Sequence, residues 1–110
     1  DLMSRKTKYS IANRAQLATE LAKVRAHGVA FERAESVPGF GCVAAPIGRQ
    51  GEAVAAVSVC GPMNRMAFEQ LTAPVRMTAM GIWRNAEDSR VAPTLQPMRP
   101  LRMGPALQYA

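Results

Sequence analysis

Small and apolar side chains fill two runs in the middle of the chain, from Gly41 to Ile47 and from Ala53 to Val59. Both runs are short, contain β-branched residues and are bounded by glycine and proline, a pattern typical of buried β-strands. Only the polar segment 48–52 separates them. The pattern therefore predicts a β-hairpin. Because a lone hairpin is marginally stable in water, we expect other elements to cover it.

The turn of this hairpin decides which residues face each other, because a one-residue slip moves every side chain to the opposite face. We favour a three-residue loop at 49–51, with Gly51 in the left-handed conformation of a bulge. A two-residue loop at Arg49 and Gln50 is the alternative, and it would place Cys42 opposite Val57. The favoured register pairs Pro46 with Val54, Ala44 with Ala56, Cys42 with Ser58 and Phe40 with Cys60.

A first helix is predicted from about Arg14 to His27. Asn13 is a suitable N-cap, Gln16 completes a variant of the capping box, and Gly28 provides a left-handed stop. Helical spacing predicts a buried stripe on this helix, made of Leu17, Leu21 and Val24 with Ala18 beside them. Residues 1–9 are polar and basic without apolar periodicity, so we expect them to form an extended lead-in to the helix.

The segment from Val29 to Ala34 alternates well enough for a short strand, and the proline and glycine of 35–39 predict a turn after it. A second helix follows the hairpin, opening at Asn64 or at Thr72. An earlier start puts Pro74 in the helix interior, at a cost of about 3 kcal/mol, whereas a start at Thr72 leaves it harmlessly in the first turn. The apolar stripe of this helix is Leu71, Val75, Ala79, Ile82 and Trp83.

The chain changes character at Ala86. Four prolines lie among polar residues without period, which predicts an irregular tail over 86–110. At 110 residues the chain corresponds to one small domain or a piece of a larger one. No stretch approaches the ~20 apolar residues of a membrane span. We therefore expect a cytoplasmic protein without membrane contact.

The net charge of +6 raises the question of nucleic-acid binding. Its distribution argues against that function, because the sheet region 29–62 has two arginines and three glutamates and is slightly acidic. Aromatic residues also do not alternate with the basic ones, as base stacking requires. Solvated helix faces are the simpler explanation.

The two cysteines have neither CxxC spacing nor a histidine cluster, which argues against a metal site. In the favoured register they are diagonal neighbours, so we expect free thiols. His27 is the sole histidine, and its place at a helix end among cations favours a surface residue. Nothing places it beside a cysteine, so cysteine catalysis is disfavoured.

Phe40, Cys42, Ser58 and Cys60 share one face of the favoured hairpin, among alanines and valines. Apolar faces with a few convergent polar groups are how small-ligand pockets are lined. Buried cysteines acting as small apolar residues are the competing interpretation.

Residues Thr7 to about Arg84 resemble the effector-binding domain of IclR-type bacterial transcriptional regulators. The resemblance lies in a Thr-x-x-Ser-Ile-x-Asn approach to the first helix, the spacing L-x(3)-L-x(2)-V-R-x(2)-G from Leu17 to Gly28, and GVAFERAE ending at Glu35. GFGCVAAPI followed by GEAVAAVSVCGPMNR is its most specific part.

This resemblance implies a GAF-like α+β fold, an antiparallel sheet flanked by helices, of which residues 1–85 form the C-terminal part. It implies a non-catalytic sensor of a small organic acid, without cofactor. Such a sensor changes the DNA binding of a separate winged helix-turn-helix domain, which is absent from this chain. The ligand positions carried over are Glu32, Phe40, Cys42, Ser58 and Cys60. Cys60 departs from the serine common in the family, which weakens hydrogen bonding to a carboxylate.

The same resemblance leaves two functions open. One is effector sensing. The other is a structural role in dimerisation or further oligomerisation, with no working ligand site. An incomplete domain leaves a sheet edge or face unpaired, so we expect self-association to a dimer or tetramer.

Overall fold

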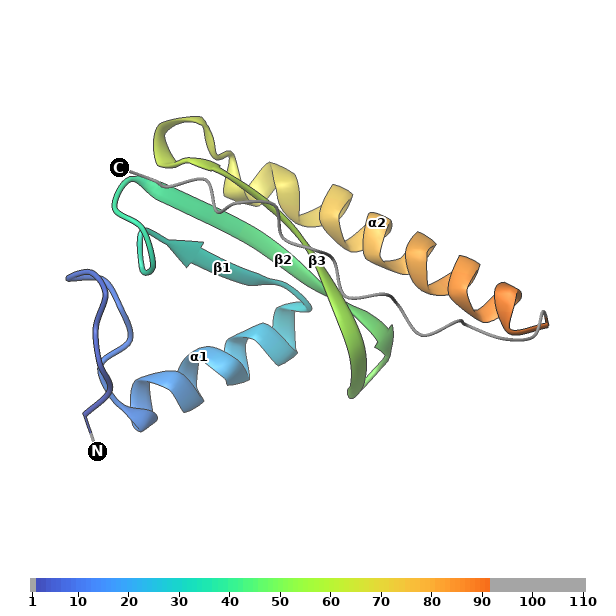
Figure 1. Cartoon of the computed structure of the whole chain (residues 1–110), viewed down its shortest axis with the longest axis horizontal. Coiled ribbons are helices and arrows are strands. Elements are labelled where there is room, and N and C mark those ends of the chain that lie inside the picture. Colours follow the sequence, from blue (N-terminus) through green and yellow to red (C-terminus); the bar gives the residue numbers. More distant parts are fainter. Residues whose placement is uncertain (1, 92–110) are drawn as a thin grey trace, which may run out of the picture.

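The structure is a computed structural model that describes residues 2–91 (Figure 1). Its elements follow the order helix, three strands, helix, as the sequence predicts. They are α1 (Arg14–His27), β1 (Ala30–Arg33), β2 (Phe40–Arg49), β3 (Glu52–Pro62), the 3-10 turn η1 (Met63–Arg65), α2 (Phe68–Asp88) and the 3-10 turn η2 (Ser89–Val91). The strands form one antiparallel sheet in the order β1-β2-β3.

The ends of α1 confirm the capping prediction. The Asn13 side chain accepts a hydrogen bond from the Gln16 amide at 2.9 Å, and the Gln16 side chain accepts one from the Ala12 amide at 2.9 Å. Gly28 ends the helix with φ +74°. The first bond satisfies one of the amide donors that the first turn leaves without helical partners, and the second satisfies the amide of Ala12, which precedes the N-cap.

The predicted burial of α1 is wrong for the described residues. Leu17 and Val24 are half-buried, while Ala18 is exposed and Leu21 is 41% exposed. No residue of α1 is buried. No described element buries the four residues of the predicted stripe.

The β2–β3 register differs from both alternatives considered from the sequence. Arg49 pairs with Glu52 across a two-residue turn, and Val54 is an extra residue in β3 between the partners of Gly48 and Ile47.

The turn and this bulge each move the register by one residue relative to the favoured one. A shift of two preserves the faces, because side chains alternate with a period of two. Cys42 is therefore opposite Cys60 rather than Ser58.

The core lies between the sheet and α2, which runs along one face of it (Figure 1). Every second residue of β2 is buried there, and Val43 is completely buried. Val75 and Ala79 of α2 pack against this row. The members of the core are Val29, Val43, Ala45, Ile47, Val75 and Ala79, with Phe31, Val57, Met66, Phe68, Leu71 and Trp83 around them.

The second helix begins at Phe68, between the two predicted starts. Pro74 thus lies in the helix interior, where it removes one backbone hydrogen bond. Neither Asn64 nor Thr72 caps the helix; the Thr72 hydroxyl instead donates to the Phe68 carbonyl at 3.2 Å. Packing of Val75 and Ala79 against the sheet offsets the unfavourable local signals.

The helix continues to Asp88 and the 3-10 turn η2 follows it, so residues 86–91, expected to begin the irregular tail, are helical. The rest of that predicted tail, from residue 92 on, lies outside the described residues.

The N-terminal segment is not a simple extended lead-in. The Thr7 hydroxyl donates to the Ala34 carbonyl at 2.6 Å, and the Ser10 hydroxyl donates to the Glu35 carbonyl. These two bonds fasten the segment to the β1–β2 turn. The Thr-x-x-Ser motif supplies both hydroxyl donors. The carbonyls that accept from them lie about 25 residues further along the chain, so the motif alone did not reveal these contacts.

Candidate ligand-binding face

The open face of the sheet is the face opposite α2. Along β2, Phe40, Cys42 and Ala44 alternate with the buried residues, so their side chains point away from α2. Ser58 and Cys60 of β3 occupy the same face and are exposed. The five ligand positions inferred from the sequence, Glu32, Phe40, Cys42, Ser58 and Cys60, all lie on this open face.

Three of these positions form one row across the sheet. Glu32 pairs with Cys42, and Cys42 pairs with Cys60. The neighbouring row is Ala30, Ala44 and Ser58, in which two alanines leave the serine without a large neighbour. The open face therefore combines sulfur, one hydroxyl and one carboxylate with small apolar side chains.

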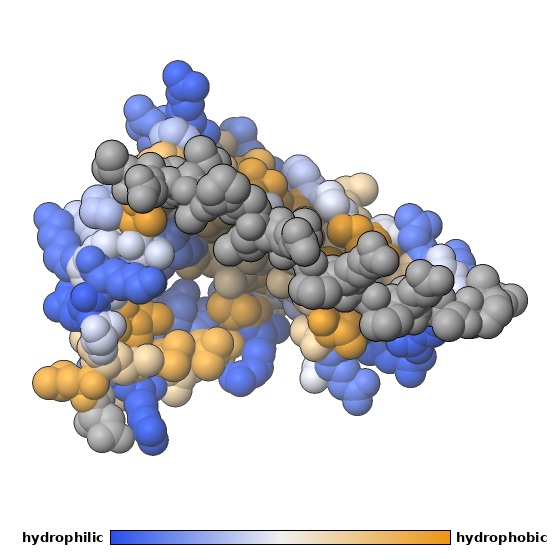
Figure 2. Space-filling view, in the orientation of Figure 1, coloured by the Kyte–Doolittle hydropathy of each residue, from blue (hydrophilic) through white to orange (hydrophobic). Residues whose placement is uncertain are grey.

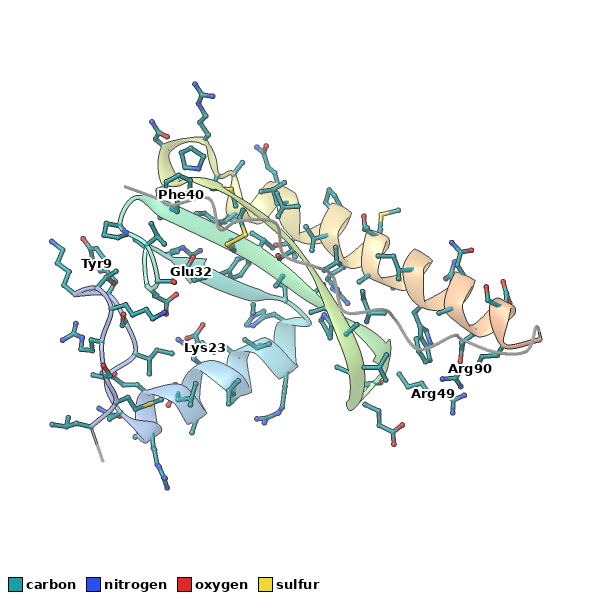
Figure 3. The ribbon with its side chains drawn as sticks, in the orientation of Figure 1. Tyr9, Lys23, Glu32, Phe40, Arg49 and Arg90 are labelled. Atoms are coloured by element: carbon teal, nitrogen blue, oxygen red, sulfur yellow. A yellow bond between two sulfur atoms is a disulfide. The ribbon has the colours of Figure 1, made fainter. Side chains whose placement is uncertain are left out.

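The two cysteines form a disulfide, which overturns the expectation of free thiols. Their Cα atoms are 4.1 Å apart, and Figure 3 shows the sulfur–sulfur bond on the sheet. The expectation failed because it rested on a register in which the cysteines were diagonal neighbours. The two-residue shift makes them direct cross-strand partners.

Ser58 lies next to this disulfide. Its hydroxyl oxygen is 3.9 Å from the sulfur of Cys60. Sulfur is a weak hydrogen-bond partner, so this hydroxyl remains available to a ligand oxygen.

The Glu32 carboxylate is already engaged within the protein. Its Oε1 accepts hydrogen bonds from the Glu35 amide at 2.6 Å and from the Ser36 amide at 3.0 Å. Glu35 in turn accepts a bond from the Arg33 amide at 3.0 Å. Glu32 therefore shapes the β1–β2 turn at the border of the open face, a role that sequence reasoning did not find.

Phe40 lies at the start of β2, opposite Pro62, and is 49% exposed (Figure 3). Val37, in the preceding turn, is 52% exposed. An aromatic ring at this border offers an apolar or aromatic ligand a surface for stacking.

Two hollows lie along α1, away from the five positions. A hollow of about 600 Å³ lies between the N-terminal segment and α1. Another of about 270 Å³ separates α1 from β1 and is visible as an opening in Figure 2. Neither is lined by any of the five ligand positions. The open face itself is uncovered, since Phe40, Ser58 and Cys60 on it are exposed.

His27 is exposed, as the sequence predicts, and its Nδ1 lies 2.8 Å from the Lys23 carbonyl oxygen. It borders the smaller hollow and is not part of the open face. Within residues 2–91, no three His, Cys, Asp or Glu side chains converge to hold a metal ion. None of the helices described in the structure is long and apolar enough to cross a membrane.

Comparison with known proteins decides the family. Residues 2–84 match the family described as bacterial transcriptional regulator IclR C-terminal. The chain belongs to this family. The HTH-type transcriptional regulator BhcR of Paracoccus denitrificans (strain Pd 1222) is 40% identical over 72 residues, which are 64% of this chain and 26% of that protein.

Solved structures agree with the IclR assignment. A transcriptional regulator from Rhodococcus sp. RHA1 matches with a TM-score of 0.71 at 32% identity, over 78% of this chain and 37% of that one. The inducer-binding domain of the PobR transcription factor from Acinetobacter, solved as a double mutant with 3-hydroxybenzoic acid, matches with a TM-score of 0.65 at 25% identity, over 73% and 49%.

These matches confirm the predicted family and α+β fold class. They also identify the homologues as transcriptional regulators. The chain spans about a quarter of the curated relative and between a third and a half of these solved chains.

Proposed function

We propose that this chain is the effector-sensing part of an IclR-type regulator, that it binds a small organic acid on the open face, and that it has no catalytic activity. The observation that carries the proposal is the convergence of Glu32, Phe40, Cys42, Ser58 and Cys60 on the one sheet face that α2 leaves uncovered.

The chemistry of the open face suits such a ligand. The Ser58 hydroxyl can donate to a carboxylate oxygen, and Phe40 with the surrounding alanines provides apolar contact. The PobR domain, which shares this fold, carries 3-hydroxybenzoic acid, an aromatic acid of the proposed class. We therefore take 3-hydroxybenzoate as the first probe.

Sensing would operate through the regulator as a whole, which we place in the cytoplasm. An acid with higher affinity for one arrangement of the regulator shifts the population toward it. DNA would be contacted by a separate winged helix-turn-helix domain, so the effector changes DNA affinity without touching DNA.

A thermal-shift screen of the 110-residue chain against 3-hydroxybenzoate and other small carboxylic acids tests the proposal. At a ligand concentration one hundred times the dissociation constant, we expect a stabilisation of about 2.7 kcal/mol. Ser58→Ala should abolish or weaken it. Ser89→Ala, which changes a serine at the end of α2, should leave it unchanged and is the matched control.

The second candidate function is a structural role in self-association, favoured by the free outer edge of β3. Among the described residues, this 11-residue strand pairs only with β2. A cooperative melt that no acid shifts would favour this function and contradict effector sensing.

A further inference from the structure

We propose that Cys42 and Cys60 are a reversible dithiol–disulfide pair through which the β2–β3 hairpin responds to the thiol redox state of its surroundings. The part that concerns effector affinity rests on the function proposed above. The redox chemistry itself does not depend on effector binding: it rests on the geometry of the hairpin and on the reducing compartment in which a DNA-binding regulator works.

The hairpin holds the two sulfurs together in either redox state. The cysteines are direct partners in the β2–β3 ladder, with Cα atoms 4.1 Å apart. The ladder continues on both sides of them, from Gly41 opposite Gly61 to Val43 opposite Val59. Reduction therefore leaves the thiols adjacent. They are also the only cysteines of the 110-residue sequence, so no other pairing competes within it.

The pair is open to small reagents. Cys60 is exposed on the edge strand, while Cys42 on the central strand is half-buried between Glu32 and Cys60. Disulfide exchange needs a thiolate to approach along the sulfur–sulfur bond, so access decides which sulfur is attacked. Because Cys60 is the more exposed residue of the two, we expect its sulfur to be attacked first.

The exchange with a small thiol such as glutathione then follows. A glutathione thiolate attacks the sulfur of Cys60, the Cys42–Cys60 bond breaks, and Cys42 leaves as a thiolate that takes a proton from water. A second glutathione thiolate attacks the glutathione sulfur of the mixed disulfide and releases the Cys60 thiolate. Two electrons have passed to the protein, and glutathione disulfide is the oxidised product.

The compartment in which the protein works is the reason to regard this disulfide as reversible rather than structural. A regulator that acts on DNA works where glutathione and thioredoxin keep thiols reduced, and disulfides found there are usually transient or redox-sensing. In that compartment, we expect an accessible cross-strand cysteine pair to be oxidised only when the surrounding glutathione pool is itself oxidised.

Oxidation changes the open face in two ways. It removes two S–H groups from the open face beside Ser58, whose hydroxyl oxygen lies 3.9 Å from the Cys60 sulfur. It also ties the edge strand β3 to the central strand β2 across a sequence separation of 18. We therefore expect the oxidised and reduced forms to bind an acid with different affinity.

A glutathione redox titration of the full chain tests the chemistry without any effector. Aliquots equilibrated at increasing ratios of glutathione disulfide to glutathione are quenched with iodoacetamide and weighed by mass spectrometry. We expect one transition from the doubly alkylated to the unalkylated protein. The oxidised form should melt at least about 5 °C higher, because the cross-link restricts the unfolded chain.

Cys42→Ser and Cys60→Ser are the matched controls, since each leaves one thiol. Each should form only a mixed disulfide with glutathione and should lose the melting difference. Two results would overturn the proposal. They are a wild-type pair that stays alkylatable in glutathione disulfide, and a pair that resists reduction by excess glutathione.

The coupling to the effector is measured separately, by repeating the 3-hydroxybenzoate thermal shift on the oxidised and reduced forms. Unequal shifts support the coupling, and equal shifts overturn it. If no acid shifts either form, effector sensing fails, while the titration still decides the redox chemistry.

Discussion

Gly41 shows how closely individual residues of β2 approach their neighbours. A Cβ atom at this position would lie 2.7 Å from the Met63 sulfur, 2.7 Å from Phe68 Cζ and 2.8 Å from the Glu32 carbonyl oxygen. The backbone oxygen cannot move aside without disturbing the β1–β2 pairing. The glycine is therefore required by the space available.

We expect Gly41→Ala to lower the free energy of unfolding by about 1–3 kcal/mol, the usual cost of overpacking. Gly81→Ala is the control, because a Cβ there meets no atom within 4 Å and alanine favours helix by about 1 kcal/mol. Urea denaturation measures both. Equal changes in the two variants would contradict the predicted crowding at Gly41.

Val43 and Val54 allow the effect of burial to be tested alone, because they are the same residue type in the same hairpin. Val43 is completely buried, whereas Val54 is 68% exposed. We expect Val43→Ala to cost about 2–3 kcal/mol through lost burial and a cavity. Val54→Ala should change stability by less than about 0.5 kcal/mol. A cost for Val54→Ala as large as that for Val43→Ala, by the same denaturation method, would argue against the position of the core.

At the scale of elements, α1 depends on its own capping rather than on packing. No residue of α1 is buried, and Asn13 supplies the N-cap hydrogen bond. An uncapped helix of this length is marginal in water without tertiary contacts.

Asn13→Ala should therefore destabilise α1 by about 1 kcal/mol and speed amide hydrogen exchange within it, while protection in β2 changes little. Asn13→Asp keeps an acceptor oxygen and serves as the control. Hydrogen exchange followed by mass spectrometry of peptides measures the difference. Uniform loss of protection across α1 and β2 would show that the helix unfolds only together with the sheet.

The hairpin illustrates a limit of turn statistics. The sequence predicted both strands and the residues that share the open face, yet neither turn considered was the one formed. Arg49 pairs with Glu52, and Val54 forms a bulge, so the register returns to the predicted faces with different partners. A turn preference is small beside the burial of Val43, Ala45 and Ile47, which fixes which face meets α2.

At the scale of the whole molecule, the uncovered sheet edge and open face favour association. The β3 edge is 11 residues long, and Val54 in it is 68% exposed. Exposed strand edges pair readily with other chains, and lysine on an edge strand blocks such pairing.

We expect sedimentation velocity to show a dimer or tetramer of this chain, and Val54→Lys to shift it toward the monomer. Met77→Lys is the matched control, because Met77 is also exposed, at 71%, but lies on α2 and not on an edge strand. A folded wild-type monomer at all concentrations would contradict self-association. If both lysine variants dissociate the oligomer equally, the contact between chains does not lie along the β3 edge.

The sequence by itself determined what depends on neighbouring residues. Asn13, Gln16 and Gly28 set the ends of α1 because capping bonds span only a few positions. The two apolar runs determined the strands, and their period of two determined which residues share a face. The quoted motifs were enough to indicate the IclR family, which the match over residues 2–84 confirms.

Only the tertiary structure decided what depends on distant partners. The turn and bulge brought Cys42 opposite Cys60 and so replaced two expected thiols with a disulfide. The start of α2 at Phe68 was set by packing of Val75 and Ala79 on the sheet, against the local signals at Asn64 and Thr72. Burial of Leu17, Leu21 and Val24 could not be read from their spacing, because helical spacing shows which residues can share a side and not whether another element covers them.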